Sequence, residues 1–312
     1  MAKALVNGIH VHHQIKGEGA DVVLIHGITS TMAIWYTRVM PALTARYRVT
    51  AYDLRGHGYT DVTPSGYTSA DMAGDLLALL DHLGIERARL VGHSFGGSVG
   101  LHLALLHPER VEGVVLVDTG IACLRHLRTI KDWPGWKLYE KELNGFGMTY
   151  DWFVGAESDD VNEVIRKSFE IPQQFGNRKG ASRATPRLRK LVDETNLGSE
   201  FRTVAGLTEE KLAEIAAPVL AVYGEQSPYQ RMAVHLQGVL PNYRCELVPD
   251  TGHFYLLQSP QLFVERIEGF LADPAGYIGQ AEASSEPSGA LQPARTSGCH
   301  DADSSEVPRS GS

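Results

Sequence analysis

The sequence predicts an α/β fold with a mostly parallel central sheet and helices on both of its faces. Short apolar runs typical of buried strands alternate along the chain with segments of helical periodicity. Parallel strands need helical crossovers, so this alternation is typical of such a sheet. The chain has 312 residues, 43% hydrophobic and 21% charged, which is enough for one large core. Functional residues are then expected in the turns at the carboxyl ends of the strands.

The elements follow in order along the chain. Residues 9–15 alternate between polar and apolar like an early strand. Buried strands are expected at 22–27, 48–53, 88–91, 111–117, 219–224 and 244–248. A helix is expected over 69–83 with Ser69 as its N-cap, another from Gly97, and a last one over 260–271.

The domain organisation is predicted as a core with one insertion. Residues 1–120 and 218–273 form the two parts of the core. Between them, residues 121–217 break the strand–helix rhythm and are rich in large aromatic residues, which indicates a helical cap over the site. Within the cap, the basic segment 178–189 is expected to be a solvated loop. Residues 274–312 are expected to form a disordered tail, because serine dominates from 281 onward and aromatic residues are absent there.

Charge and cysteine content narrow the function classes. The net charge of −8 argues against nucleic-acid and anionic-membrane partners. Cys123, Cys245 and Cys299 lack disulfide or metal spacing, so no metal is expected and a reducing compartment is favoured. No apolar run approaches the roughly 20 residues needed to cross a bilayer, and the amino terminus lacks a signal-peptide core. The expectation is a cytoplasmic protein; the oligomeric state is left open.

The most informative motif is Gly92-His93-Ser94-Phe95-Gly96. It joins an apolar strand to a helical run, and a G-x-S-x-G in this context is typical of a nucleophile elbow. Such a tight turn strains the backbone of Ser94 and points its hydroxyl away from the sheet. Gly92 and Gly96 are expected because side chains there would collide where strand and helix approach.

A serine nucleophile needs a base and an oxyanion hole. The candidate base is His253, which follows the last predicted strand and precedes the last helix. His93 is expected to point to another side of the turn. The backbone N–H groups of Ile28 and Phe95 are the candidate oxyanion donors.

Four motifs occur together and in order: His26-Gly27, the run Tyr52-Asp53-Leu54-Arg55-Gly56-His57-Gly58, the elbow, and Gly252-His253. Over residues 5–272 the chain resembles the α/β-hydrolase superfamily, in particular its small, cofactor-free, esterase-like members with a helical cap. The resemblance implies that the segment from Asp53 to Gly58 is a structural turn that braces the catalytic loops.

The resemblance leaves the orienting acid open. Most such relatives carry an aspartate after the strand written here as 219–223, whereas this chain has Ser227 at that position. Losing the carboxylate of a serine-protease triad lowers the rate about 10⁴-fold. Asp118 at the end of the preceding strand is the first candidate, Glu225 the second, and a site without a functional acid the third. Asp250 is expected to be a turn residue.

The leading hypothesis is a serine hydrolase that cleaves an ester, thioester or lactone of an apolar or aromatic small molecule. Its acyl-enzyme would form on Ser94, with His253 and Asp118 completing the triad. The resemblance implies that an elbow serine, in place of the aspartate of epoxide hydrolases and haloalkane dehalogenases, favours acyl transfer. Two alternatives remain: a non-hydrolytic enzyme catalysing cyclisation, elimination or C–C bond chemistry, and a small-molecule receptor with a vestigial triad.

Overall fold

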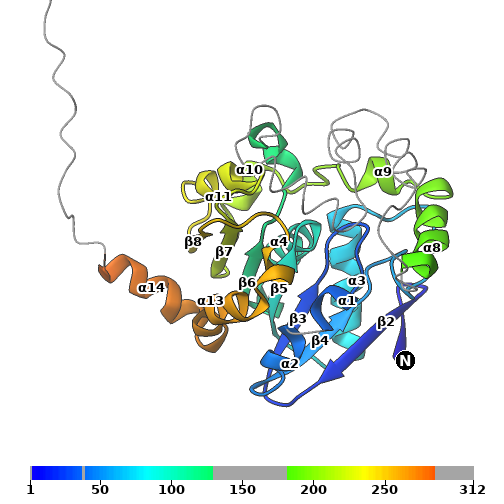
Figure 1. The fold of residues 1–312 in the computed structure, drawn as a ribbon, viewed down its shortest axis with the longest axis horizontal. Coiled ribbons are helices and arrows are strands. Elements are labelled where there is room, and N and C mark those ends of the chain that lie inside the picture. Colours follow the sequence, from blue (N-terminus) through cyan, green and yellow to red (C-terminus); the bar gives the residue numbers. More distant parts are fainter. Residues whose placement is uncertain (1, 37–38, 129–180, 285–312) are drawn as a thin grey trace, which may run out of the picture.

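The structure is a computed structural model that describes residues 2–36, 39–128 and 181–284. Its centre is an eight-stranded sheet in the order β1-β2-β4-β3-β5-β6-β7-β8 (Figure 1). The strands are β1 Ala2–Val6, β2 Ile9–Lys16, β3 Ala20–Ile25, β4 Tyr47–Tyr52, β5 Ala88–His93, β6 Val111–Val117, β7 Val219–Gly224 and β8 Tyr243–Val248. β2 pairs antiparallel with β1 and β4, and the other neighbours pair parallel. The predicted fold class is confirmed.

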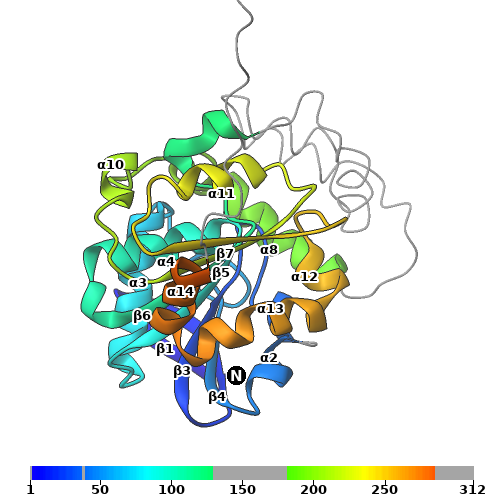
Figure 2. The same ribbon diagram turned by 90° about the vertical axis from the view of Figure 1, so that its left-hand side faces the viewer.

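Helices cover both faces of the sheet (Figure 2). One face packs against α3 Ser69–His82, α4 Phe95–Leu106 and α11 Gln230–Leu236. The other packs against α1 Ala33–Tyr36, α2 Val39–Leu43, α12 Tyr255–Gln258, α13 Pro260–Ala272 and α14 Pro274–Ser284. Neighbouring side chains of one strand enter opposite cores, as Leu90 and Val91 of β5 do, which explains the continuous apolar runs of these strands.

The remaining described elements are short or belong to the insertion. They are the 3₁₀ turns η1 Pro108–Arg110 and η2 Ala122–Leu127, and the helices α8 Ala181–Asp193, α9 Leu197–Glu200 and α10 Glu209–Leu212. Residues 129–180, which make up much of the predicted cap and hold most of its large aromatic residues, lie outside the described residues. The segment after them is fixed to the core, because the Glu200 carboxylate accepts the N–H groups of Gly66 and Tyr67 at 2.8 Å each.

Three local expectations differ from the structure. The first strand, β1, was not expected; it forms a hairpin with β2 through Asn7 and Gly8, whose φ angles of 47° and 75° suit the Asn-Gly turn. The N-cap of α3 is Thr68 and not Ser69, because Thr68 and Asp71 form a reciprocal capping box. The segment expected as a basic loop at 178–189 is helical from Ala181.

The predicted boundary of the disordered tail at residue 274 is also too early. Residues Pro274–Ser284 form helix α14. The Tyr277 hydroxyl donates to Glu246 Oε1 of β8 at 2.6 Å, its ring packs on Phe270 of α13, and Ile278 is buried in the core. These two apolar anchors precede the serine-rich composition, which explains the difference. Residues 285–312 lie outside the described residues.

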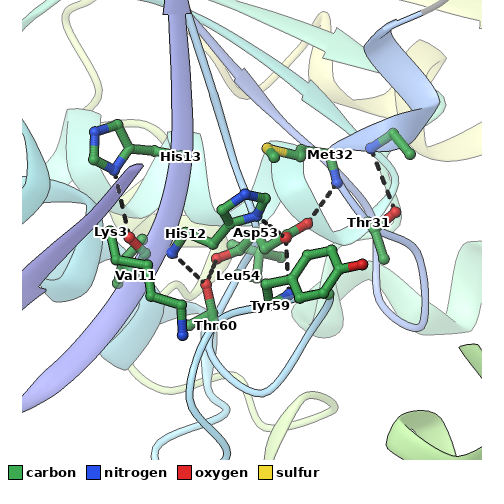
Figure 3. Close-up of polar contacts among 12 residues, drawn as sticks. Lys3, Val11, His12, His13, Thr31, Met32, Asp53, Leu54, Tyr59 and Thr60 are labelled. Carbon is green, nitrogen blue, oxygen red and sulfur yellow. Dashed lines mark hydrogen bonds and ion pairs between the residues drawn. The ribbon is translucent and has the colours of Figure 1, made fainter. Parts of the chain in front are cut away.

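Asp53, directly after β4, joins three parts of the molecule (Figure 3). Its carboxylate accepts the N–H of Met32 at 2.8 Å, the N–H of Tyr59 at 3.0 Å and the Nδ1–H of His12 on β2 at 2.7 Å. Both side chains of the His12–Asp53 pair are buried. The segment that begins at Asp53 therefore has the bracing function that the family resemblance implied.

Replacing Asp53 by Asn is expected to lower the free energy of unfolding by about 3–5 kcal/mol, because the amide group turns a donor toward buried donors and leaves His12 without its carboxylate. Urea-induced unfolding followed by circular dichroism measures the effect. The matched control is Asp61→Asn: Asp61 accepts from His10 on the same strand at 2.9 Å, but both side chains are exposed. A loss under about 1 kcal/mol is expected there. Equal losses would contradict this account of Asp53.

Candidate active site

Ser94 lies between the end of β5 and the start of α4. Its φ of 53° and ψ of −123° lie in a region that residues with a side chain rarely adopt. Hydrogen bonds hold this conformation: the Ser94 N–H donates to Val117 O of β6 at 2.9 Å, and the Gly97 N–H donates to Ser94 O at 3.1 Å. Ser94 is partly exposed while the residues on both sides are buried. The motif therefore has the geometry of a nucleophile elbow.

The two glycines of the motif are sterically required. A Cβ on Gly92 would lie 2.4 Å from Gly96 O and Gly97 N, and a Cβ on Gly96 would lie 2.4 Å from Ile25 O. At Gly92 the strand and the helix of the elbow approach too closely for a side chain, and at Gly96 the start of the helix lies equally close to the end of β3. This steric requirement is the reason that the sequence analysis gave for glycine at both positions.

His253 reaches the site from the turn between β8 and α12, and it is 4% exposed. Its carbonyl accepts a hydrogen bond from His93 Nε2–H at 3.1 Å, and the two imidazole rings are 4.8 Å apart. His93, which directly precedes Ser94, therefore connects the turn containing His253 to the elbow. Burial lowers the pKa of His93 to about 3, so this ring is neutral and serves as a structural donor.

Asp118 follows β6 and is fully buried, with a φ of 46°. Its Oδ1 lies 3.9 Å from His253 Nδ1, and its Oδ2 accepts the N–H of Gly224 at 2.9 Å. Of the other carboxylates considered, Glu225 and Asp250 are both exposed. The structure therefore brings Asp118 next to His253. A hydrogen bond between them requires a small closure, because 3.9 Å exceeds the usual donor–acceptor distance.

Burial sets the protonation of this pair. It raises the pKa of Asp118 to about 7, against the opposing effects of hydrogen bonds from Ser227 and Gly224 and of the nearby His93. It lowers the pKa of His253 to about 3, with a further contribution from the positive charge of Arg128. His253 is therefore a neutral imidazole near neutral pH, as a general base must be.

The loop after β3 is tied to the segment after β4 by two neutral histidines. His26 donates from Nδ1 to Gly27 O at 2.7 Å and accepts the Leu54 N–H at Nε2. His57 donates from Nδ1 to Arg55 O and accepts the Thr29 N–H at 3.0 Å. These bonds place the loop containing Ile28.

The loop passes close to the nucleophile. A Cβ on Gly27 would lie 2.9 Å from Ser94 Cβ. The Ile28 and Phe95 N–H groups donate to no other residue in the described parts of the chain. Both are therefore available as donors to a bound oxygen.

Aromatic side chains surround the site residues. The rings of Tyr229 and Phe254 lie 5.2 Å and 4.7 Å from that of His253, and Phe201 packs edge-on against Phe95 at 6.2 Å. The sequence analysis placed the aromatic residues over the site in the cap at 121–217, a range that contains Phe201 but not Tyr229. Ser227 stands at the position where the acid is usually found. Tyr229 could have been noticed, because it lies only two residues after Ser227.

Within the described residues, no group of three or more histidine, cysteine or acidic side chains could hold a metal ion. None of the helices in those same ranges has the length and apolar character to cross a membrane.

Comparison with known proteins identifies the family of this chain. The profile of the α/β-hydrolase-fold family matches residues 22–260. The chain therefore belongs to the α/β-hydrolase family, as its resemblance implied.

Named relatives are hydrolases of several kinds. A putative carbamate hydrolase, RutD, of Stutzerimonas stutzeri strain A1501 is 28% identical over 87% of this chain and 98% of its own. A soluble epoxide hydrolase of Corynebacterium sp. strain C12 is 28% identical over 86% of this chain and 96% of its own. Among solved structures, Est816, described as an N-acyl homoserine lactone degrading enzyme, is 25% identical with a TM-score of 0.59, covering 86% of this chain and all of that one. These matches support a hydrolase.

Proposed function

We propose that this protein is a serine hydrolase that cleaves a carboxylic ester, thioester or lactone of a small apolar or aromatic molecule. The observation that carries the proposal is the arrangement at the carboxyl ends of β5, β6 and β8. The elbow presents Ser94, His93 connects it to the His253 turn, and Asp118 Oδ1 lies 3.9 Å from His253 Nδ1. Nucleophile, base and orienting acid are the three parts that acyl transfer requires.

The proposed reaction has two halves. Ser94 Oγ attacks the carbonyl carbon while His253 Nε2 takes the hydroxyl proton, and Asp118 stabilises the resulting imidazolium. The tetrahedral oxyanion is bound by the Ile28 and Phe95 N–H groups. His253 then gives the proton to the departing alcohol or thiol. In the second half a water molecule, deprotonated by His253, attacks the acyl-enzyme and releases the acid and free Ser94.

The surroundings of the site support the substrate class. Phe95, Phe201, Tyr229 and Phe254 offer apolar ring surfaces near the nucleophile and the base. Hydrolysis of a carbamate bond, which the name of one relative describes, is acyl transfer at a carbonyl carbon. A non-hydrolytic enzyme or a receptor was considered because Ser227 stands where most relatives carry the acid. The position of Asp118 beside His253 weakens that reason.

A panel of p-nitrophenyl esters of increasing chain length tests the proposal, together with labelling by a fluorophosphonate probe. We expect hydrolysis of short and aromatic esters, an initial burst of p-nitrophenol from acyl-enzyme formation, and an adduct on the peptide containing Ser94 by mass spectrometry. A folded protein that neither hydrolyses any ester nor takes the label would overturn the proposal. Ligand binding without turnover would then favour the receptor.

The pH dependence of kcat/KM is expected to show one acidic limb near pH 7. Protonation removes the Asp118 carboxylate below its pKa of about 7, whereas His253, with a pKa of about 3, stays neutral over that range. Activity should therefore fall as the pH falls through 7, and remain level above it. Initial rates from pH 5 to 9 measure this. A limb that persists unchanged in Asp118→Asn would assign it to another group.

A further inference from the structure

Two buried tyrosines reach the turn that carries Asp118, one from each face of the sheet. Tyr223 of β7 belongs to the core formed with α3, α4 and α11, and Tyr255 of α12 belongs to the core on the other face. Both side chains are 0% exposed. Burial raises the pKa of each hydroxyl well above its usual value, and the nearby charge of Asp118 raises it further. Both groups therefore remain protonated donors near neutral pH.

Each hydroxyl donates to the backbone of this part of the sheet. Tyr223 Oη donates to Thr119 O, the carbonyl of the residue after Asp118, at 2.9 Å. Tyr255 Oη donates to Val222 O at 3.3 Å, and the same carbonyl accepts the Asp118 N–H at 3.3 Å. Tyr223 thus binds the backbone just after Asp118, and Tyr255 binds the carbonyl to which the Asp118 N–H is attached.

The backbone of Asp118 needs such support. Its φ of 46° lies in the left-handed region, which residues with a side chain rarely adopt and which persists only where the surroundings fix it. The Gly224 N–H holds Asp118 Oδ2 at 2.9 Å, and Oδ1 lies 3.9 Å from His253 Nδ1. Because a hydrogen bond needs a separation of about 3 Å, a small change in this turn decides whether the pair can close.

Tyr255 also belongs to the turn that carries the base. It lies two residues after His253, and its N–H donates to Gly252 O at 3.3 Å. One residue is thus attached through its backbone to the turn of the base and through its hydroxyl to the strand that holds the acid.

We infer that Tyr223 and Tyr255 are positioning residues whose hydroxyls set the separation of Asp118 and His253. The Tyr223 hydroxyl holds the acid turn in its left-handed conformation, and the Tyr255 hydroxyl ties the base turn to the end of β7. Both bind backbone carbonyls, so they act on the two side chains through the backbone. This inference rests on the proposed function.

The test uses Tyr223→Phe and Tyr255→Phe, which remove a hydroxyl and keep the ring. With p-nitrophenyl esters, kcat per active site is expected to fall about 3- to 10-fold in each variant, with little change in KM, because a misplaced acid affects the chemical step. Active sites are counted by mass spectrometry of the fluorophosphonate adduct on Ser94. A fold defect alone lowers the number of labelled sites and leaves the rate per site unchanged.

Tyr243→Phe is the matched control. The Tyr243 hydroxyl also donates to a backbone carbonyl, Ala233 O at 2.6 Å, but Tyr243 begins β8 at the end opposite to the turn of His253. Wild-type kcat per site is expected there. The same loss in Tyr243→Phe, or an unchanged kcat per site in either Tyr223→Phe or Tyr255→Phe, would overturn the inference.

The Asp118→Asn background provides a second test. If the hydroxyls act by placing the acid against the base, neither tyrosine substitution should cause a further loss once the carboxylate is gone. Equal fold-losses in the two backgrounds would contradict the positioning role.

The two levels of the proposal fail in different ways. A protein that hydrolyses esters and takes the label, but whose rate per site ignores both hydroxyls, would refute this inference alone. A folded protein inert to ester and label would refute the proposed function, and the positioning role with it.

Discussion

Replacing Asp118 by Asn is expected to lower kcat about 10⁴-fold with little change in KM, the magnitude for a serine-protease triad in which Asn replaces the acid. The amide cannot stabilise the imidazolium, and its NH₂ group favours the wrong tautomer of His253. Initial rates on the best p-nitrophenyl ester, at a pH above 8 where wild-type Asp118 is ionised, give the comparison. Asp118 lies 3.9 Å from His253, so the effect should appear in the chemical step and not in binding.

Glu225→Gln is the matched control, because Glu225 follows the next strand but its side chain is exposed. Near-wild-type activity is expected. The reverse pattern, with loss only in Glu225→Gln, would assign the acid to Glu225.

Stability offers a second readout for Asp118→Asn. A carboxyl pKa raised from 3.8 to about 7 means that the native state disfavours the charge, so wild-type stability declines as the pH rises through this interval. Asp118→Asn should remove that decline and should be the more stable protein at pH 8. A variant that is less active and more stable separates loss of function from loss of fold.

Most of the sheet was predictable from the sequence because its central strands, β3 to β7, are buried on both faces. Continuous apolar runs such as Val219–Gly224 identify them without any alternation. The hairpin strand Ala2–Val6 was missed, since its pattern is half exposed and lies at the sheet edge. Helix Pro274–Ser284 was missed because composition averaged over the tail concealed two anchoring residues, Tyr277 and Ile278.

The candidate site was predictable where it depends on local geometry. The glycines around Ser94 follow from close approach of backbone atoms, which the spacing of the motif itself encodes. The contact between Asp118 and Gly224 could not be read in this way. It depends on the lateral pairing of β6 with β7, which places two turns more than 100 residues apart in the sequence side by side. Sequence reasoning identified each position but not the contact between them. The catalytic roles stay predictions until the variants are measured.

Two substitutions of Ser94 are expected to abolish activity while changing stability in different ways. Ser94→Ala and Ser94→Gly both remove the nucleophile, and loss of such a serine in subtilisin lowers kcat about 10⁶-fold. Alanine keeps a Cβ at φ 53° and ψ −123°, so it retains the backbone strain of the wild type. Glycine tolerates this conformation, so Ser94→Gly should be more stable than Ser94→Ala by about 1–2 kcal/mol, although glycine normally loses more entropy on folding.

Thermal unfolding and fluorophosphonate labelling of the Ser94 variants, with Ser98→Ala as control, test this expectation. Ser98 is a buried serine one turn along α4, with its hydroxyl on Gly120 O at 3.0 Å, and its variant should still take the label. Residual labelling of Ser94→Ala would place the nucleophile elsewhere. Equal stability of the alanine and glycine variants would mean that the elbow is not strained. Greater stability of the inactive glycine variant would show that the fold holds Ser94 in an unfavourable backbone conformation. Such strain is expected where a side chain is retained for its chemistry and not for packing.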